Sequence, residues 1–250
     1  MPDRTGLTIG LAERLGVRVV EHGAIESTME AALTDPGPAP VVHLAASQSA
    51  GRGRHGREWR SPPGNLYATI RWPEPDDPFP TGLLGAVQIE WARTIAAAGG
   101  PEVRCKWPND GWLDGAKWAG LLAARPAARP GEIHLGLGAN LVTAPSVEGT
   151  EVACLRVRWT EWPGAGEATA LLLGAALRVL RDGPAGIGPR LASWSLHDAL
   201  KPGEPLVVEG AGGQVEGAYL GIDPEGRLRL AARGGEVRVS SGDVRRVRPV

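Results

Sequence analysis

Two of the three lysines in this 250-residue chain lie in one short stretch, where their charge could act on an anion. The stretch begins Lys106-Trp107-Pro108-Asn109-Asp110 and continues, after six residues, Lys117-Trp118-Ala119-Gly120-Leu121-Leu122. An ammonium group is a compact point charge that suits a phosphate or carboxylate whose geometry changes during a reaction. Lys106 and Lys117 are therefore candidate catalytic residues, and a solvated hairpin with two exposed lysines is the alternative.

A hairpin must position these two lysines. Pro108 interrupts regular pairing just before an Asn-Asp pair. The pattern predicts a strand that enters from Val103, a turn at residues 111–115, and a second strand at residues 117–123. Ammonium groups would then stand near both ends of the hairpin, with an amide and a carboxylate between them.

A second candidate is a loop rich in glycine and arginine, Gly51-Arg52-Gly53-Arg54-His55-Gly56-Arg57-Glu58-Trp59. Its glycines match the spacing of a dinucleotide-binding motif, which requires a helix that begins at the glycines. The chain continues instead into Ser61-Pro62-Pro63-Gly64, which excludes that helix. The sequence predicts a flexible loop that brings three arginines near an anion. A solvated basic loop is the alternative.

The elements around these stretches follow from hydrophobic periodicity. Residues 83–98 form the clearest predicted helix, because Val87, Trp91 and Ile95 recur at helical spacing. Ser27 or Thr28 is expected to cap a helix at residues 29–33, which leaves the other hydroxyl to contact a ligand. The remaining predictions are strands at 17–21, 41–46, 65–72 and 133–141 and helices at 167–180 and 189–194.

The composition changes near the C-terminus. Short apolar runs at 206–208, 215–222, 228–232 and 237–240 alternate with glycine-rich turns. These runs predict a small β-barrel that must pack against the neighbouring domain to bury enough surface. We place the boundary near residue 198, which gives domains at 1–198 and 199–250.

Composition also limits the class of protein. The formal net charge of −1 argues against bulk attraction to DNA. No apolar run approaches the roughly 18 residues of a membrane span, so we expect no membrane partner. The two cysteines, Cys105 and Cys154, form neither a disulfide framework nor a metal-spacing motif. Free thiols indicate a cytoplasmic protein.

Taken together, these motifs resemble those of the biotin protein ligase family, the biotin–[acetyl-CoA-carboxylase] ligases. The likeness rests on the arginine loop, on both halves of the lysine hairpin, and on Gly136-Leu137-Gly138-Ala139-Asn140. The motifs occur in the family's order, and the resemblance covers nearly the whole chain. It implies an α+β fold: a mixed-sheet catalytic domain of the class II aminoacyl-tRNA synthetase and biotin ligase type, followed by a small SH3-like β-barrel.

The resemblance implies a two-step reaction that uses biotin, ATP and Mg²⁺. Biotin's carboxylate attacks the α-phosphate of ATP to give biotinyl-5′-AMP, and a lysine of a biotin carboxyl carrier domain then attacks this mixed anhydride. A lipoate- or octanoate-protein ligase of the same superfamily is one alternative, and a non-catalytic biotin-sensing module is another. The arginine loop and the hairpin are signatures of the biotin side, and the presence of both lysines argues against a sensor.

The resemblance also implies roles for single residues. The biotin-binding residues would be Ser27, Thr28, Gln48, Arg52, Gly53, Arg54, Lys117 and Gly120. The ATP-binding residues would be Arg54, Trp59, Lys106, Asn109, Asp110 and Asn140. Lys117, Arg54 and Lys106 are the expected catalytic residues, and no direct metal ligand is implied.

Two features depart from the family pattern. Met29 stands where a polar asparagine is common, so one hydrogen bond at the edge of the pocket is expected to be missing. The residues before Ser27 leave no room for the winged-helix DNA-binding domain that some members carry. We therefore expect a ligase that binds no nucleic acid.

Overall fold

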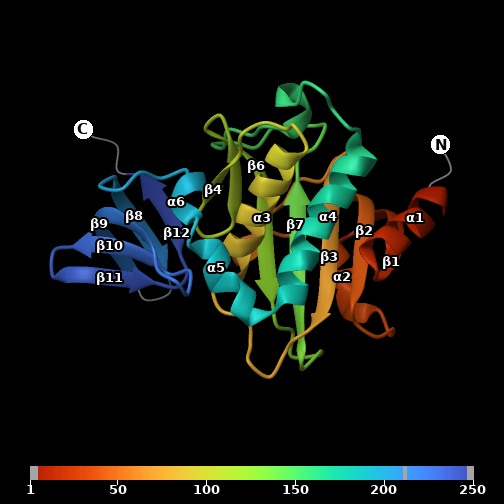
Figure 1. Ribbon diagram of the computed structural model, residues 1–250, viewed down its shortest axis with the longest axis horizontal. Coiled ribbons are helices and arrows are strands. Elements are labelled where there is room, and N and C mark those ends of the chain that lie inside the picture. The colour runs from red at the N-terminus through yellow and green to blue at the C-terminus, as the bar shows by residue number, and fades with distance from the viewer. Residues whose placement is uncertain (1–4, 211–212, 247–250) are drawn as a thin grey trace.

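The computed structural model describes residues 5–210 and 213–246, which contain two separate sheets (Figure 1). The larger sheet has seven strands in the order β1-β2-β3-β7-β6-β5-β4, and only β1 and β2 pair in parallel. Its strands are β1 (Arg18–Ile25), β2 (Val41–Gln48), β3 (Leu66–Pro73), β4 (Arg104–Lys106), β5 (Asp110–Leu113), β6 (Ala116–Ala124) and β7 (Glu132–Ala139). The predicted mixed sheet is confirmed.

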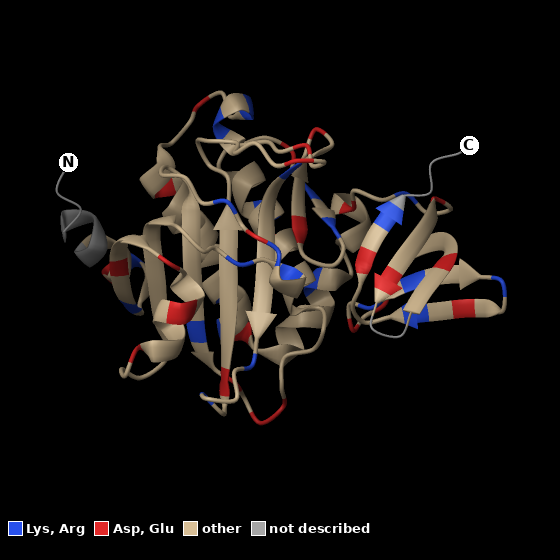
Figure 2. Cartoon of the chain, turned by 180° about the vertical axis from the view of Figure 1, so that it is seen from behind, with Lys and Arg blue, Asp and Glu red and all other residues tan. Residues whose placement is uncertain are grey.

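Helices cover one face of this sheet and leave the other largely to loops. Figure 1 shows α3 (Leu83–Ala97) and α4 (Ala165–Asp182) lying across the near face, and α1 (Thr5–Leu15) packs beside α4. The shorter helices α5 (Ile187–Leu191) and α6 (Trp194–His197) follow α4, and 3₁₀ turns lie at Arg54–Gly56, Leu155–Arg158 and Pro184–Gly186. On the opposite face α2 (Thr28–Thr34) packs on β2 and β3. Figure 2, seen from behind, shows loops crossing that face.

Strand periodicity explains the two faces. In β7, Ile133, Leu135 and Leu137 point into the core under α3 and α4, whereas Gly136 and Gly138 alternate with them and face the loops. Successive residues of a strand point to opposite sides, so one strand supplies both a packed core and an open floor. The helix at 83–98 was predicted almost to the residue because it lies in this core.

The structure corrects the predicted hairpin. Residues 111–113 belong to strand β5 rather than to a turn, and the chain turns instead at Asp114 and Gly115, which both have positive φ. Gly111 serves packing: a Cβ there would lie 2.8 Å from Nε1 of Trp118. Glycine was interpreted as a turn signal, but close approach of an indole requires it equally. Helix α1 was also missed, because Gly6 and Gly10 lower the helix propensity of residues 5–15.

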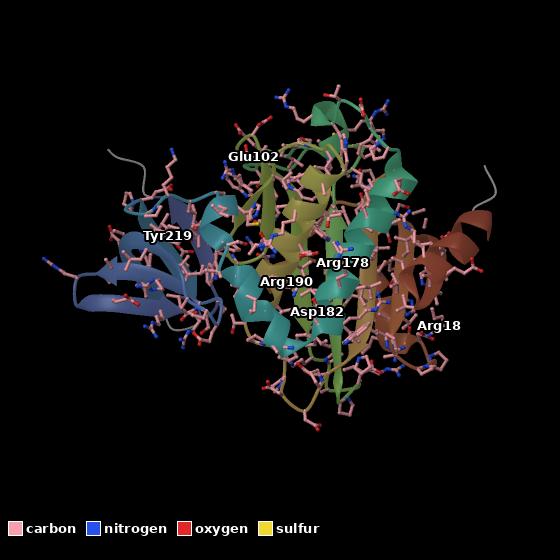
Figure 3. All side chains as sticks on the ribbon, viewed as in Figure 1. Arg18, Glu102, Arg178, Asp182, Arg190 and Tyr219 are labelled. Atoms are coloured by element: carbon pink, nitrogen blue, oxygen red, sulfur yellow. The ribbon has the colours of Figure 1, made fainter. Side chains whose placement is uncertain are left out.

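The second sheet lies beside the first and is wholly antiparallel. Its order is β11-β10-β9-β8-β12, and its strands are β8 (Pro205–Gly210), β9 (Gly213–Ile222), β10 (Leu228–Ala232), β11 (Gly235–Val239) and β12 (Asp243–Arg246). Tyr219, labelled in Figure 3, donates to Oδ2 of Asp198 at 2.5 Å, and Nε1 of Trp194 donates to the same oxygen at 2.8 Å. Such buried contacts provide the support that a small sheet needs from its neighbour.

No helix within the described ranges combines the length and the apolar character needed to cross a lipid bilayer.

Candidate functional site

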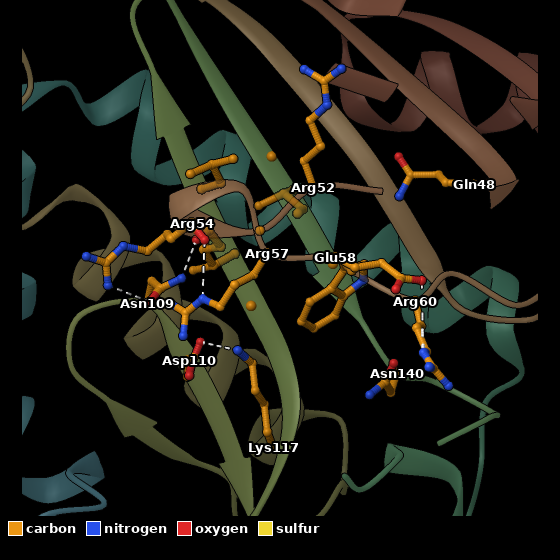
Figure 4. Close-up of a pocket in the computed structure, with 18 of the residues that line it drawn as sticks. Gln48, Arg52, Arg54, Arg57, Glu58, Arg60, Asn109, Asp110, Lys117 and Asn140 are labelled. Atoms are coloured by element: carbon orange, nitrogen blue, oxygen red, sulfur yellow. Dashed lines mark hydrogen bonds and ion pairs between the residues drawn. The ribbon is translucent and has the colours of Figure 1, made fainter. Parts of the chain in front are cut away.

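A pocket opens on the sheet face opposite α3 and α4 (Figure 4). Strands β3, β6 and β7 form its floor, α2 forms one end, and two loops at residues 49–61 and 143–152 border it. Nη1 of Arg60 donates to the backbone oxygen of Ser146 at 2.7 Å and so joins the two loops. Of the residues predicted from the sequence, the following line the pocket: Ser27, Thr28, Gln48, Arg52, Gly53, Arg54, Trp59, Asn109, Asp110, Lys117, Gly120 and Asn140.

Paired glycines give the pocket a flat floor. Gly120 of β6 pairs with Gly138 of β7, and the indole of Trp59 lies on both. A Cβ at Gly138 would lie 2.6 Å from Cε2 of Trp59, and one at Gly120 would lie 2.9 Å from Cζ3. Gly120 was expected to bind biotin, and in the structure the group that closely approaches both glycines is an aromatic ring of the arginine loop.

A β-bulge aims Lys117 into the pocket. The register between β5 and β6 shifts beside Gly111, so that Trp118 has no register partner on β5, and its side chain turns into the core near Trp91, with 5.7 Å between ring centroids. Strict alternation would place Lys117 on the same face as Ala119 and Leu121, but one extra residue reverses that. The Lys117 ammonium reaches Oδ1 of Asp110 at 2.7 Å (Figure 4).

Lys106 is the predicted site residue that the structure places elsewhere. It does not line the pocket, and its ammonium lies 4.5 Å from the centroid of the Trp112 ring. Both side chains come from neighbouring strands of the hairpin, and a cation is attracted to the face of an indole. The two scarce lysines therefore lie in different surroundings.

Two of the three arginines of the loop, Arg54 and Arg57, approach the Asp243 carboxylate, and Arg52 lies apart from them. The Arg52 guanidinium extends away from the pocket and comes within 4.0 Å of Glu30, at an exposed position (Figure 4). Arg54 donates to Oδ1 of Asn109 at 3.4 Å and to the backbone oxygen of Gly242 at 3.1 Å. Burial lowers the pKa of Arg54, and the Asp243 carboxylate opposes that shift. The loop was expected to bring its arginines near an anion, and here Arg54 and Arg57 share a carboxylate of the protein itself while Arg52 does not.

Asparagine side chains fix the backbone around the pocket. Asn109 donates through Nδ2 to the backbone oxygen of Leu121 at 2.7 Å, and this bond ties the turn between β4 and β5 to β6. Oδ1 of Asn65 accepts the backbone amides of residues 141, 142 and 143 at 2.9–3.0 Å, which holds the start of the second loop. Asn140 is 2 % exposed and lies beside Asn65. The sequence reasoning missed Asn65, although the chain's scarcity of asparagine could have drawn attention to it.

The two hydroxyls at the start of α2 have separate roles. Oγ of Ser27 accepts the backbone amide of Met29 at 3.2 Å and is the helix cap. Thr28 is free of capping, and its amide and hydroxyl both donate to Oε1 of Gln48. The Met29 thioether lines the same end of the pocket, where its methyl lies 3.0 Å from a Cβ built at Gly136. This end of the pocket combines uncharged hydrogen-bonding groups with one flexible apolar side chain.

Comparison with known proteins reveals the chain's relatives. Residues 24–140 match the model of the biotin/lipoate A/B protein ligase family. The chain is 31 % identical over 217 residues to a biotin–[acetyl-CoA-carboxylase] ligase of Paracoccus denitrificans, a match that covers 80 % of this chain and 88 % of that protein. The chain belongs to the biotin protein ligase family.

Further matches agree with this membership. Residues 203–246 match the biotin protein ligase C-terminal domain, so the second sheet is also a family element. A biotin–[acetyl-CoA-carboxylase] ligase of Mycobacterium tuberculosis is 34 % identical, with 82 % of this chain and 78 % of that protein covered. The structure of an Aquifex aeolicus biotin protein ligase with biotin and ATP superposes with a TM-score of 0.81 at 19 % identity, covering 92 % of this chain and 99 % of that one. This likeness establishes the biotin protein ligase fold.

Proposed function

We propose that this chain is an ATP-dependent biotin ligase that makes biotinyl-5′-AMP and transfers biotin to a lysine of a biotin carboxyl carrier domain. The observation that carries the proposal is the polarity of one pocket. Uncharged hydrogen-bonding groups, Thr28 and Gln48, line one end, and a lysine paired with a carboxylate lies further along, with the Trp59 indole over glycines nearby. A ligand with a neutral polar head, an apolar middle and a carboxylate tail matches that order.

The first step brings two anions together. A carboxylate oxygen of biotin forms a bond to the α-phosphorus of ATP while the bond to the bridging oxygen breaks and pyrophosphate leaves. Lys117 supplies positive charge at the carboxylate and then at the acyl-phosphate link, and Arg54 does so on the nucleotide side. The chemistry asks for no protein nucleophile, so positioning and charge are the protein's main contributions.

The second step is transfer to the partner. The neutral amine of a carrier lysine attacks the acyl carbon of the adenylate, AMP leaves with the bonding electrons, and the amine loses a proton. Arg54, Trp59 and the second loop would keep water from the mixed anhydride until the carrier arrives. The relatives from Paracoccus denitrificans and Mycobacterium tuberculosis are named for acetyl-CoA carboxylase, and we propose a carrier domain of that kind here.

Mg²⁺ is proposed to enter with ATP. Within residues 5–210 and 213–246 no three His, Cys, Asp or Glu side chains gather to hold a metal alone. Mg²⁺ commonly binds one or two carboxylates, substrate phosphates and water, so the pocket carboxylate of Asp110 fits the ion. When bound, the ion would neutralise phosphate charge.

The proposal also covers the two domains, the ancestry of the catalytic sheet and the cellular location. The ligase domain would span residues 1–198, and the smaller domain would span 199–250 as an SH3-like barrel, which is supported by its five antiparallel strands. The catalytic sheet would share its ancestry with class II aminoacyl-tRNA synthetases. Cys105 and Cys154 are buried free thiols, which supports a cytoplasmic location.

The test is a mass measurement on an acceptor. The full chain is incubated with a carrier domain, Mg-ATP and either biotin or lipoate, and the carrier mass is recorded. We expect the mass increase of one biotinyl group, lost when the carrier's acceptor lysine is replaced by arginine. A lipoyl adduct in place of the biotinyl adduct would favour the lipoate ligase, and no adduct from either acid would refute the proposal.

A further inference from the structure

Ser61 lies just behind the pocket and connects two groups that line it. Its side chain is nearly buried, at 7 % exposed, and it is not a lining residue. The Ser61 hydroxyl lies 2.9 Å from Nε2 of Gln48 and 2.9 Å from the backbone oxygen of Trp59. The backbones also meet here, since the Gln48 amide donates to the Ser61 oxygen at 3.2 Å. Ser61 therefore contacts both the α2 end of the pocket and the base of the arginine loop.

The neighbours of Gln48 fix the direction of each hydrogen bond. The backbone amide of Thr28 can only donate, so the Gln48 atom 2.8 Å from it is the oxygen. The amide nitrogen of Gln48 must then face Ser61, where it donates to the hydroxyl. Because a carbonyl oxygen only accepts, the Ser61 proton is directed to Trp59. One hydroxyl thus accepts from one side and donates to the other.

The chain of bonds continues to the floor of the pocket. Thr69 of β3 donates to the Thr28 hydroxyl at 2.9 Å, and Thr28 donates to Oε1 of Gln48 at 3.1 Å. The hydroxyl protons of both threonines are donated within this series of hydrogen bonds, in the direction of the arginine loop. The groups left for a ligand are acceptor lone pairs on the two threonines and one N–H of Gln48. A ureido group, with two N–H donors and one carbonyl acceptor, is complementary to that set.

Gly51 allows these groups to come together at the base of the loop. A Cβ on Gly51 would lie 2.4 Å from the Trp59 oxygen, 2.7 Å from Oγ of Ser61 and 2.9 Å from Nε2 of Gln48. The Trp59 amide also donates to the Gly51 oxygen at 2.8 Å, so the base of the loop is closed on both sides. Because Gly51 has no side chain, Ser61 can hydrogen-bond both to Gln48 and to the Trp59 oxygen.

We infer that Ser61 is a positioning residue for biotin: its hydroxyl orients the Gln48 amide and couples that end of the pocket to the Trp59 backbone. The inference rests on the proposed function, because it assigns the ureido end of biotin to this hydrogen-bond chain. Ser61 touches neither the reacting carboxylate nor the nucleotide. Its effect must therefore appear in biotin affinity and leave the chemical step unchanged.

Biotin-dependent exchange of pyrophosphate into ATP tests this on the full chain. In Ser61→Ala we expect the KM for biotin to rise about tenfold, the effect of losing roughly one hydrogen bond. The kcat and the KM for ATP should stay within about twofold of wild type. Ser61→Thr keeps the hydroxyl and should recover most of the biotin affinity.

A matched control comes from Ser193. Its hydroxyl also accepts from a side chain, Nη2 of Arg93 at 2.9 Å, and donates to a backbone oxygen, that of Arg190 at 2.9 Å, but it lies outside the pocket. Ser193→Ala removes the same kind of group and should leave the KM for biotin unchanged. If Ser61→Ala and Ser193→Ala behave alike, or if Ser61→Ala lowers kcat and raises both KM values together, the inference is wrong.

A double-mutant cycle tests the coupling. Thr69→Val removes the first donor of the chain and Ser61→Ala removes the last. If this series of hydrogen bonds acts as a unit, the rise in the KM for biotin in the double variant is smaller than the product of the two single effects. If the two single rises in the KM for biotin simply multiply in the double variant, the coupling is refuted. A wild-type chain without biotin-dependent exchange would overturn the proposed function, and with it this inference.

Discussion

Arg57 of the arginine loop pairs with Asp243 of the C-terminal sheet, with Nη2 and Oδ1 2.9 Å apart. The same carboxylate lies 3.5 Å from the more buried guanidinium of Arg54. Asp243 is the first residue of β12, so the smaller sheet contacts the loop that borders the pocket. Because an opposite charge holds a guanidinium at a defined position, the C-terminal sheet takes part in placing the loop.

Removing this charge should loosen the loop. In Asp243→Asn we expect biotinyl-adenylate to form but to escape more readily, so that lysines of unrelated proteins become labelled. An exposed ion pair contributes about 0–1 kcal/mol, so the increase should be about fivefold or less for this partly exposed pair. Streptavidin blotting of a mixture of carrier and excess albumin measures it.

The control is Glu209→Gln, since Glu209 pairs with Arg245 at 3.1 Å within the C-terminal sheet and lies outside the pocket. This variant should label only the carrier. Equal labelling of albumin by wild type and Asp243→Asn would show that the pair does not hold the loop.

Loss of the Lys117 ammonium should slow adenylation strongly. Removing a preorganised charge donor to a developing anion typically costs about 3–4 kcal/mol, so Lys117→Ala should reduce pyrophosphate release by roughly 10²–10³-fold. Lys117→Arg should recover little, because a planar guanidinium cannot take the ammonium's place beside Asp110. Lys201→Ala is the control, because Lys201 is exposed and lies just before β8. This variant should release pyrophosphate at the wild-type rate. Wild-type pyrophosphate release in Lys117→Ala would remove Lys117 from the active site.

Gly138→Ala should displace the Trp59 indole. The new methyl would lie 2.6 Å from Cε2 of that ring, and the loop can relieve the clash by moving away. We therefore expect a loss in activity, about 5- to 150-fold in kcat/KM for biotin if the clash costs 1–3 kcal/mol, with little change in Tm. Gly23→Ala is the matched control, because nothing lies within 4 Å of a Cβ at that strand glycine.

A second variant separates this cause from others. If the indole is what the methyl displaces, Trp59→Ala should make Gly138→Ala nearly silent, because the two changes remove one contact. If the losses in activity of the two single variants multiply in the double variant, then Gly138 makes room for a group other than the Trp59 indole.

Stability should fall in mild acid because of His43. The His43 side chain is 2 % exposed, its Nε2 lies 3.2 Å from Asp35, and its Nδ1 lies 3.1 Å from Nε2 of His22. Burial lowers the pKa of His43 to about 4, and the Asp35 carboxylate opposes that shift only in part. Between pH 6.5 and about 4, His43 binds a proton in the unfolded chain but not in the folded chain. The stability present above pH 6.5 is therefore lost as the pH falls.

Urea unfolding at several pH values measures this effect. We expect the free energy of unfolding to drop by about 1–3 kcal/mol between pH 7 and pH 4.5, and His43→Asn should show a shallower decline. Burial tends to raise the pKa of Asp35, but hydrogen bonds from Gly37 and Arg18 outweigh it and lower the pKa to about 2. A further loss should therefore follow below pH 4. Identical slopes in wild type and His43→Asn would exclude His43 as the cause.

Much of the molecule follows from local pattern in the sequence. The helix at Leu83–Ala97 and strands such as Glu132–Ala139 follow from periods of 3.6 and 2, because a side chain's direction along a regular element depends on its neighbours in the chain. The scarcity of lysine singled out Lys117, and the run of motifs identified the family. Most of the predicted site residues do line one pocket, since those motifs meet on one face of the sheet.

Tertiary packing decided what local pattern could not. Lys117 faces the pocket only because Trp118 enters the core and forces a bulge, whereas Lys106 faces Trp112. Local periodicity cannot anticipate an extra residue whose position depends on a distant helix. The contact of Arg57 with Asp243 joins residues 186 apart in sequence, and the contact of Ser61 with Gln48 joins the two ends of one loop, 13 residues apart. Such pairs carry no periodic signal, because they exist only after the sheets have packed together.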